Sequence, residues 1–192
     1  MSARLPSDPI DRLFARFPLL EAEQITLRRL RRSDAQDLFA VFSDDEVTRH
    51  YDLATFEEAD EALDLIDFVA ESYAAERQVR WAIELRGTQR VVGTCGFVWL
   101  RPHSAEIGYD LARKFWGQGI MYEALTTLLT YAFEELTLNR IEALVIPANV
   151  RSRRLLERLG FVHEGTLREY DFFKDAFHDM EMYALLRRDW MA

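Results

Sequence analysis

The sequence predicts an α+β domain in which helices pack against a central β-sheet. Apolar runs of strand length recur along the chain, for example at residues 143–146. Between two such runs, residues 120–136 place apolar side chains at intervals of three and four, the spacing of an amphipathic helix with one buried stripe. Strands that meet helices in this way indicate one sheet carrying helices.

The first half of the chain is expected to form two helices and four strands. The strands cover residues 25–27, 79–85, 91–100 and 105–111, and the helices follow residue 33 and cover residues 56–75. Ser33 and Gln36 match a capping box at the start of the first helix. Residues 86–89 are expected to connect two of these strands as a hairpin, and Pro102 is expected to end the strand 91–100.

The second half adds the long helix, a strand, a shorter helix and two closing strands. The strand over 141–146 stops at Pro147, and the closing strands cover 162–173 and 177–186. Asn149 is expected to cap the N-terminus of the shorter helix. Gly160 stands where a left-handed C-terminal cap belongs.

Composition limits the classes of protein to consider. The chain has 192 residues, of which 24 are Lys or Arg and 33 are Asp or Glu, so its formal net charge is −9. A hydrophobic content of 49% is that of a folded protein with a sizeable core. The acidic balance argues against nucleic acid as a partner, because binding to phosphates needs a basic face.

Compartment and metal content follow from a few residue types. One cysteine excludes an internal disulfide framework and fits a reducing compartment, so we expect a cytoplasmic protein. Charged residues interrupt the first 20 positions, and no apolar run approaches the ~20 residues of a membrane helix, so neither a secretory signal nor a membrane contact is expected. The four histidines lack metal-ligand spacing, and no metal site is predicted.

Gly117 and Gly119 lie directly between a strand and the long helix. Glycine allows a close backbone approach and positive φ, and a helix N-terminus offers free N–H groups and partial positive charge. The junction suits an anion such as pyrophosphate, although a tight turn that needs glycine for geometry alone is an equal alternative. A Walker loop and a dinucleotide fingerprint both fail, because no Lys-Ser/Thr and no third glycine follow.

The same loop carries the first part of a family resemblance. Lys114-x-x-Gly117-x-Gly119 resembles the Arg/Gln-x-x-Gly-x-Gly/Ala loop with which GCN5-related N-acetyltransferases (GNAT) hold the pyrophosphate of acetyl-CoA. Lysine in the first position departs from that pattern but is still cationic.

Further motifs follow in the order of the RimJ/RimL-like branch of that family. They are Glu106-Ile-Gly-Tyr109 and Asn149-x-x-Ser152-x-x-Leu-Leu-Glu-x-Leu-Gly-Phe. The resemblance covers nearly the whole chain, so we expect a single domain over residues 1–192 with its core at about 23–190.

The resemblance implies a central mixed, mostly antiparallel sheet flanked by helices on both faces. It also implies that the strand before the glycine loop and the strand 141–146 splay apart, so that the pantetheine arm of CoA pairs with strand backbone in the gap. Acetyl-CoA is then the co-substrate. The residues expected to bind it are Tyr109, Leu111, Lys114, Phe115, Trp116, Gly117, Gln118, Gly119, Ile120, Asn149 and Arg153, with Arg151 also near the phosphates.

Two residues are candidates for the chemistry. Glu106 is the leading candidate for the general base that deprotonates an amine, with a solvated strand glutamate as the alternative. Glu106 shares a strand face with Gly108, which is expected to leave room for a substrate. Ser152 is implied by the branch as proton donor to the CoA thiolate, with Tyr122 or Tyr170 as alternatives.

The expected function is direct acetyl transfer from acetyl-CoA to a primary amine. An α-amine has a pKa of about 8 against about 10.4 for lysine, so a protein N-terminus is the easier acceptor at neutral pH. The family resemblance also points to ribosomal-protein-like N-termini. Small-molecule amines such as polyamines or antibiotics, and a catalytically silent CoA-binding module, are the alternatives, and the branch suggests a homodimer.

Overall fold

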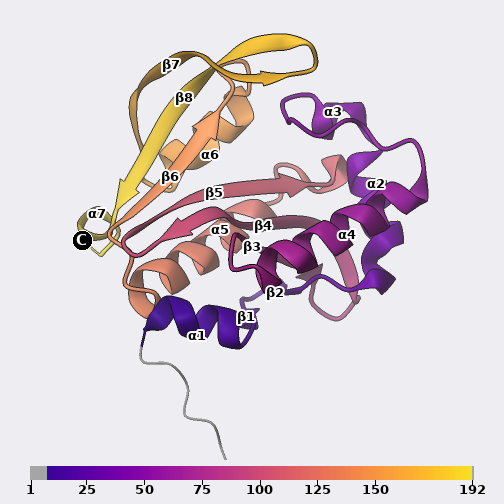
Figure 1. Cartoon of the computed structure of the whole chain (residues 1–192), viewed down its shortest axis with the longest axis horizontal. Coiled ribbons are helices and arrows are strands. Elements are labelled where there is room, and N and C mark those ends of the chain that lie inside the picture. Colours follow the sequence, from indigo (N-terminus) through magenta and orange to yellow (C-terminus); the bar gives the residue numbers. More distant parts are fainter. Residues whose placement is uncertain (1–7, 192) are drawn as a thin grey trace, which may run out of the picture.

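A computed structural model describes residues 8–191 as an eight-stranded sheet with helices on both faces (Figure 1). The strands lie in the order β1-β2-β3-β4-β5-β6-β8-β7. Neighbouring strands in this sheet are antiparallel except β5 and β6, which run parallel. The predicted α+β class and the mixed, mostly antiparallel sheet are confirmed.

The elements have the following bounds. The strands are β1 Leu20–Glu21, β2 Ile25–Arg29, β3 Val79–Leu85, β4 Arg90–Arg101, β5 Ser104–Leu111, β6 Arg140–Val145, β7 Val162–Phe173 and β8 Ala176–Leu186. The helices are α1 Pro9–Ala15, α2 Ala35–Phe42, α3 Asp45–Thr48, α4 Ala59–Ala74, α5 Ile120–Thr130, α6 Val150–Arg158 and α7 Arg187–Trp190. Among the described residues, no helix is long and apolar enough to cross a membrane.

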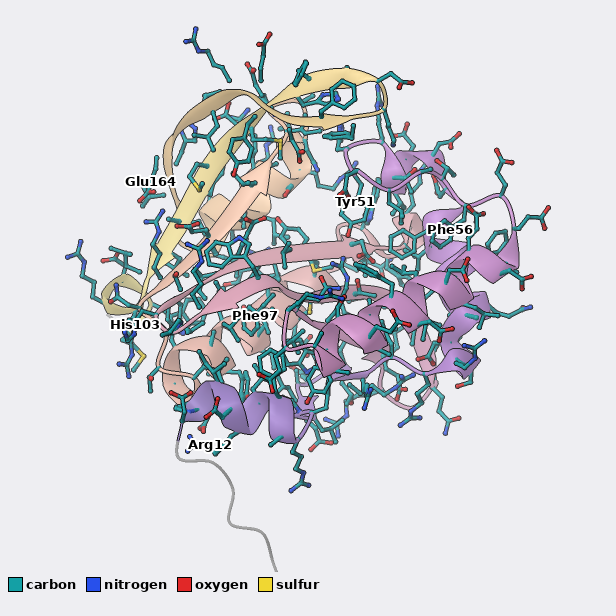
Figure 2. All side chains as sticks on the ribbon, viewed as in Figure 1. Arg12, Tyr51, Phe56, Phe97, His103 and Glu164 are labelled. Carbon is teal, nitrogen blue, oxygen red and sulfur yellow. The ribbon has the colours of Figure 1, made fainter. Side chains whose placement is uncertain are left out.

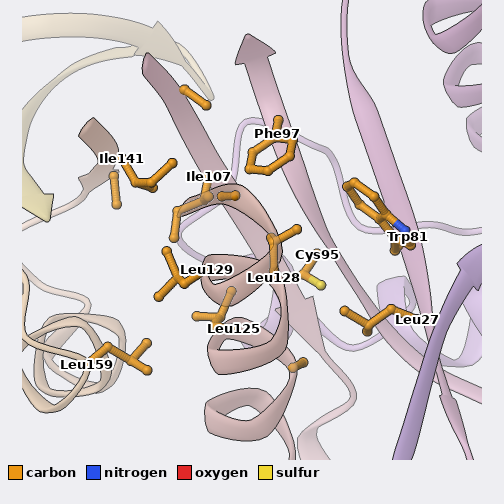
Figure 3. Packing of buried hydrophobic residues seen from close by; sticks show 14 of the residues in the cluster. Leu27, Trp81, Cys95, Phe97, Ile107, Leu125, Leu128, Leu129, Ile141 and Leu159 are labelled. Carbon is orange, nitrogen blue, oxygen red and sulfur yellow. The ribbon is translucent and has the colours of Figure 1, made fainter. Parts of the chain in front are cut away.

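Two apolar cores lie on opposite faces of the sheet, because consecutive strand residues point to opposite sides. On β3, Trp81 belongs to the larger core with α1 and α5, whereas its neighbour Ala82 packs with α2 and α4. Figure 3 shows the larger core, in which Trp81 and Phe97 of the sheet face Leu125 and Leu128 of α5. The apolar stripe predicted for residues 120–136 is therefore the contact face of α5.

The pairing between β5 and β6 is short. Only Ser104–Glu106 pair with Arg140–Glu142 in the described sheet, and the two strands diverge beyond these positions. The edge of β5 from residue 107 to residue 111 consequently has no β6 partner. This is the splayed arrangement that the family resemblance implies, and it opens the sheet beside the glycine loop.

The capping box predicted at Ser33 is wrong. Ser33 lies in a 3₁₀ turn, Arg32–Asp34, and α2 begins at Ala35. The Asp34 carboxylate accepts the backbone N–H of Arg31 at 2.8 Å and binds the buried guanidinium of Arg28 at 2.8 and 2.9 Å. A buried ion pair to Arg28 of the preceding strand β2 therefore sets the start of this helix.

Other boundaries shift by smaller amounts. The helix expected over 56–75 begins at Ala59, and the helix expected over 120–136 changes at Tyr131 into a π-helical turn that ends at Glu135. Helix α1 precedes the core boundary expected at about residue 23, yet its Leu13 is buried in the larger core. The left-handed conformation expected at Gly160 is confirmed by a φ of +89°.

Candidate active site

A cavity of about 430 Å³ lies where β5 and β6 diverge. Its walls come from the end of β5, the glycine loop, the first turn of α5, one face of α6 and the α3 segment with residues 46–51. Figure 2 shows Tyr51, which lines this cavity, in the space between α3 and the sheet. Segments distant in sequence thus enclose one site.

The glycine loop forms one end of the cavity. Gly117 and Gly119 line it and have φ of +75° and +83°, and a Cβ on either would meet no atom within 4 Å. Glycine is needed here for the backbone conformation, not for space. Helix α5 begins at Ile120, so the N–H groups of its first turn, which have no intrahelical acceptor, lie at the same place. The turn and anion interpretations of the loop are therefore compatible.

Two loop residues expected at the ligand do not line the cavity. The Gln118 side chain donates to the Lys114 carbonyl at 2.7 Å and braces the loop. The Lys114 ammonium lies 5.0 Å from the centre of the Phe115 ring, and Lys114 lines a neighbouring pocket of about 130 Å³. Phe115 borders both spaces, and Ile120 lines the larger one.

The end of β5 forms the floor of the cavity. Tyr109 and Leu111 both line it, and the Leu111 carbonyl accepts a hydrogen bond from the Trp116 indole N–H at 2.7 Å. The Tyr109 hydroxyl lies 2.6 Å from Ser152 Oγ. Burial raises the pKa of Tyr109, so the phenol keeps its proton at neutral pH. Sequence reasoning named Tyr109 only for its backbone and missed this hydroxyl pair.

Helix α6 brings Ser152 to Tyr109. Asn149 Oδ1 accepts the backbone N–H of Ser152 at 3.2 Å, which confirms the predicted N-cap. Asn149 also lines the cavity, so its side chain can hold the helix end and face a ligand. The cap fixes the first turn of α6, and with it the position of the Ser152 hydroxyl.

The arginines of α6 divide between two faces. Arg151, Arg154 and Arg158 line the cavity. The Arg151 guanidinium lies 3.7 Å from the centre of the Trp116 ring, and that of Arg158 lies 4.1 Å from the centre of Tyr122.

Arg153, the arginine expected at the ligand, faces another way. It donates to the Tyr183 hydroxyl and to the Pro147 carbonyl, each at 3.2 Å, and does not line the cavity. Helical spacing could have separated the two faces in advance. Residues 154 and 158 lie three and seven positions after residue 151 and therefore share its face, whereas residue 153 lies only two positions after it and points elsewhere.

Glu106 lies near the divergence of the strands but does not line the cavity. Its carboxylate accepts the Trp99 indole N–H at 2.7 Å. Burial raises the pKa of Glu106, the Trp99 hydrogen bond opposes that shift, and the nearby charges of Glu142 and Asp171 add to it. A carboxyl group with a raised pKa is chemically suited to take a proton from an amine.

The room expected beside Glu106 is not empty. A Cβ on Gly108 would lie 2.9 Å from Val98 Cγ2, so Val98 fills the space that glycine leaves. Asp110, further along the same face, lines the cavity and pairs with the buried Arg80 guanidinium at 2.6 Å. The Thr94 hydroxyl joins both groups, at 2.6 Å from each. The sequence offered no local signal for this network, because its members come from three strands.

A long-range contact lies beside the wall of the cavity that α3 and residues 46–51 form. The tip of the β7–β8 hairpin reaches α3, where the Lys174 ammonium donates to the Thr48 carbonyl at 2.7 Å (Figure 1). His50, beside this contact, lines the cavity, and burial lowers its pKa. Tyr170 of β7 is exposed, whereas Tyr122 lines the cavity under Arg158.

Other reactive side chains do not contribute a site. Among the described residues, no group of three or more His, Cys, Asp or Glu side chains could hold a metal ion. Cys95 is fully buried, and burial raises its pKa to about 12, so it is a poor nucleophile.

Residues 24–162 match the family described as the acetyltransferase (GNAT) domain. The chain belongs to the GNAT family. An uncharacterized N-acetyltransferase of Bacillus subtilis (strain 168), YoaA, is 38% identical over 173 residues, which are 89% of this chain and 98% of that protein. This GNAT chain is therefore an N-acetyltransferase, with the RimJ/RimL-like character that its motifs indicated.

Two further comparisons are informative for parts of the molecule. The ribosomal protein uS5-alanine N-acetyltransferase of Escherichia coli (strain K12) is 38% identical over 88 residues, 46% of this chain and 45% of that enzyme. The structure of RimL, a ribosomal L7/L12 α-N-protein acetyltransferase in complex with coenzyme A, has a TM-score of 0.78 at 20% identity and covers 88% of this chain and 98% of its own. The latter likeness concerns the fold.

Proposed function

We propose that this GNAT enzyme uses acetyl-CoA to acetylate the N-terminal α-amine of a protein of ribosomal type. The hydroxyl pair of Tyr109 and Ser152, which lines the same cavity as the glycine loop, is the observation that carries the proposal. The partial match to an enzyme that acetylates the alanine of ribosomal protein uS5 supports this acceptor class. The proposed location is the cytoplasm and the proposed assembly a homodimer, both on the sequence expectations above.

The cavity fits a co-substrate that has a peptide-like arm and an anionic tail. The unpartnered edge of β5 offers backbone hydrogen bonds to the arm, and the glycine loop with the first turn of α5 offers N–H groups to the tail. Backbone N–H groups near Leu111 would polarise the thioester carbonyl, a contribution of about 3–4 kcal/mol.

Glu106 takes the proton of the attacking amine in this proposal. Because Glu106 is held by Trp99 and does not line the cavity, the proton reaches it through a water molecule. General-base catalysis of this kind contributes roughly 10²–10⁴-fold in rate.

Ser152 and Tyr109 act on the leaving thiolate. A Tyr109 hydroxyl that donates to Ser152 Oγ leaves the serine proton free to point at the sulfur. Tyr109 is then a positioning residue that sets the direction of the Ser152 hydroxyl, and its raised pKa keeps the phenol protonated. A proton from water restores the Ser152 hydroxyl after its own proton has passed to the sulfur.

The test is thiol release from acetyl-CoA with three panels of acceptor: peptides with free α-amines, polyamines and aminoglycosides. We expect turnover with the peptides, and no turnover with the same peptides after their N-termini are blocked. Turnover confined to polyamines or aminoglycosides would replace the proposed acceptor with a small amine. Calorimetric titration with acetyl-CoA, run in parallel, separates a missing acceptor from a missing co-substrate site.

A further inference from the structure

Arg80 and Asp110 form a charge-neutral pair beside the floor of the cavity. The Arg80 guanidinium, buried on β3, donates from Nη2 to the Asp110 carboxylate and from Nε to the Thr94 hydroxyl, each at 2.6 Å. The other carboxylate oxygen of Asp110 accepts the backbone N–H of Thr94 at 3.0 Å. Because the two charges compensate each other, the pair brings a guanidinium to the cavity without adding a net charge.

Arg80 faces the side of β5 that carries Glu106. Its remaining nitrogen, Nη1, lies 3.7 Å from the position that a Cβ on Gly108 would take. Glu106, Gly108 and Asp110 alternate along β5 and so share one face of the sheet. The Arg80 guanidinium therefore lies on the same face as the proposed general base.

Tyr51 lines the cavity beside this pair. Its ring stacks on Phe42 with the ring centres 6.3 Å apart, and the guanidinium carbon of Arg80 lies 6.0 Å from the centre of the Tyr51 ring. The turn that carries Tyr51 is fixed at the Thr48 carbonyl, which accepts the Tyr51 N–H at 3.0 Å and the Lys174 ammonium at 2.7 Å. Tyr51 therefore has a defined position on the cavity wall.

The Tyr51 hydroxyl has a proton to donate. Burial raises the pKa of Tyr51, and the charge of Arg80 and a hydrogen bond from it oppose that rise without reversing it. The phenol is therefore protonated at neutral pH, and a hydroxyl that accepts from a guanidinium can still donate. Within residues 8–191, no group accepts this proton, and the Asp110 carboxylate is already bonded to Arg80 and Thr94. The hydroxyl can serve an oxygen that enters the cavity.

Asp110 places this hydroxyl near the reacting atoms of the proposed transfer. On β5, Asp110 stands between Tyr109, which belongs to the proposed proton donor, and Leu111, near which the thioester carbonyl is polarised. An amine that attacks there has its own substituents beside Tyr51. In a peptide the first carbonyl oxygen lies next to the α-amine, whereas a polyamine has no carbonyl. A neutral amide oxygen also suits a donor site without net charge.

We infer that the Tyr51 hydroxyl, held by the Arg80–Asp110 pair, binds the carbonyl oxygen of the acceptor's first residue and so selects α-amines that adjoin a carbonyl group. This inference rests on the proposed function and names the part of the acceptor that is recognised. Tyr51 is a specificity-determining residue, and Arg80 is a positioning residue that acts through it. A site that hydrogen-bonds an oxygen of its substrate disfavours an analogue without that oxygen, because the donor is then left unpaired.

The test compares two acceptors in thiol release from acetyl-CoA: a peptide with a free N-terminus, and the same peptide with its first amide replaced by a trans alkene. The alkene keeps the amine and the shape of the chain but has no carbonyl. We expect Tyr51→Phe to lower the preference in kcat/KM for the peptide over the alkene about tenfold relative to the wild type, by slowing the peptide alone. Comparing this preference between proteins cancels the different basicity of the two amines.

Tyr131→Phe is the matched control for Tyr51→Phe. Tyr131 lies in the π-helical turn after α5 and does not line the cavity, and the variant removes only a hydroxyl. It should keep the preference of the wild type.

Arg80→Lys tests the positioning role. Lysine keeps a positive charge beside Asp110 but lacks the planar fork that reaches Asp110, Thr94 and Tyr51 together. We expect the peptide to be slowed and the alkene unchanged, with no further loss in Arg80→Lys/Tyr51→Phe. A merely structural role of Arg80 would slow both acceptors equally. If Arg80→Lys does not fold, the comparison in Tyr51→Phe decides the inference by itself.

Two kinds of result would overturn the inference, and they are distinguishable. If the wild type acetylates the peptide and Tyr51→Phe slows both acceptors alike or neither, the carbonyl contact is wrong and the proposed function stands. If the wild type releases thiol with polyamines alone, or with no acceptor, the proposed function is refuted and the carbonyl contact with it.

Discussion

In the proposed function, the cavity has a donor side, formed by the glycine loop, α5 and α6, and an acceptor side, formed by the α3 segment with the β7–β8 hairpin, and the two sides are built in different ways. The donor side consists of contiguous segments, with the glycine loop running directly into α5 and the Asn149 cap leading directly to Ser152. The acceptor side joins distant segments, and its closing contact links Thr48 to Lys174, 126 positions apart. Binding of the donor can therefore be encoded in short motifs, whereas selection of the acceptor depends on how loops meet in the folded chain.

The largest expected effect is at Glu106, which lies outside the cavity lining on the strand that forms its floor. Glu106→Gln should lower kcat/KM by about 10²–10⁴-fold and leave the Kd for acetyl-CoA unchanged. A general base must be deprotonated, so wild-type activity should be lost as the pH is lowered through the pKa of Glu106. Because that pKa is raised, the loss should begin at a higher pH than for an ordinary carboxylate, and this acid limb should be absent from the variant. The measurement is a pH profile of kcat/KM with an α-amine acceptor and with a lysine acceptor, which separates the limb of Glu106 from that of the amine.

Glu71→Gln is a matched control for this change, because Glu71 is an exposed glutamate of α4. An unchanged rate and pH profile in Glu106→Gln would assign the base to another group.

Gly117→Asp tests the donor side alone. We expect acetyl-CoA affinity to fall about 100-fold, because the substitution strains a left-handed backbone and places a negative charge at the phosphate site. Gly87→Asp is the control, since Gly87 has a φ of +76° in the β3–β4 turn and equally open surroundings. Both variants should lose similar stability in urea unfolding. A Gly117→Asp protein that binds acetyl-CoA as the wild type does would remove the phosphate site from this loop.

Ser152→Ala and Tyr109→Phe sharpen the description of the donor side. Each should lower kcat by about 10–100-fold, with the Kd for acetyl-CoA changed by less than about threefold. The two losses should not add in the double variant, because the hydroxyls form one hydrogen-bonded unit. Additive losses measured by steady-state kinetics would mean that the two residues act separately.

Lys174→Ala is expected to have the smallest effect, and on the acceptor side only. Loss of the contact with Thr48 should raise KM for a peptide acceptor about 3–10-fold, through looser positioning of the hairpin. The Kd for acetyl-CoA should be unchanged in the same protein. A change confined to acetyl-CoA binding would show that the hairpin belongs to the donor side.

The division between the two sides also describes what the sequence predicted. Periodicity indicated most strands and the helices that carry the site, and local chemistry indicated the Asn149 cap and the positive φ of Gly119. These features depend on neighbouring residues. The Arg80–Asp110 pair and the Val98 side chain over Gly108 depend on the register of strands, which no local pattern showed. The start of α2 was predicted wrongly because the Asp34 carboxylate binds the Arg28 guanidinium of β2 and the backbone N–H of Arg31, contacts that the capping-box pattern does not include.

The contact between the β7–β8 hairpin and α3 has a topological consequence. While the Lys174 ammonium donates to the Thr48 carbonyl, residues 48–174 form a ring of chain closed by one hydrogen bond. The ring ties the tip of the hairpin to the segment whose His50 and Tyr51 line the cavity, so a displacement of the tip either breaks that bond or moves that wall.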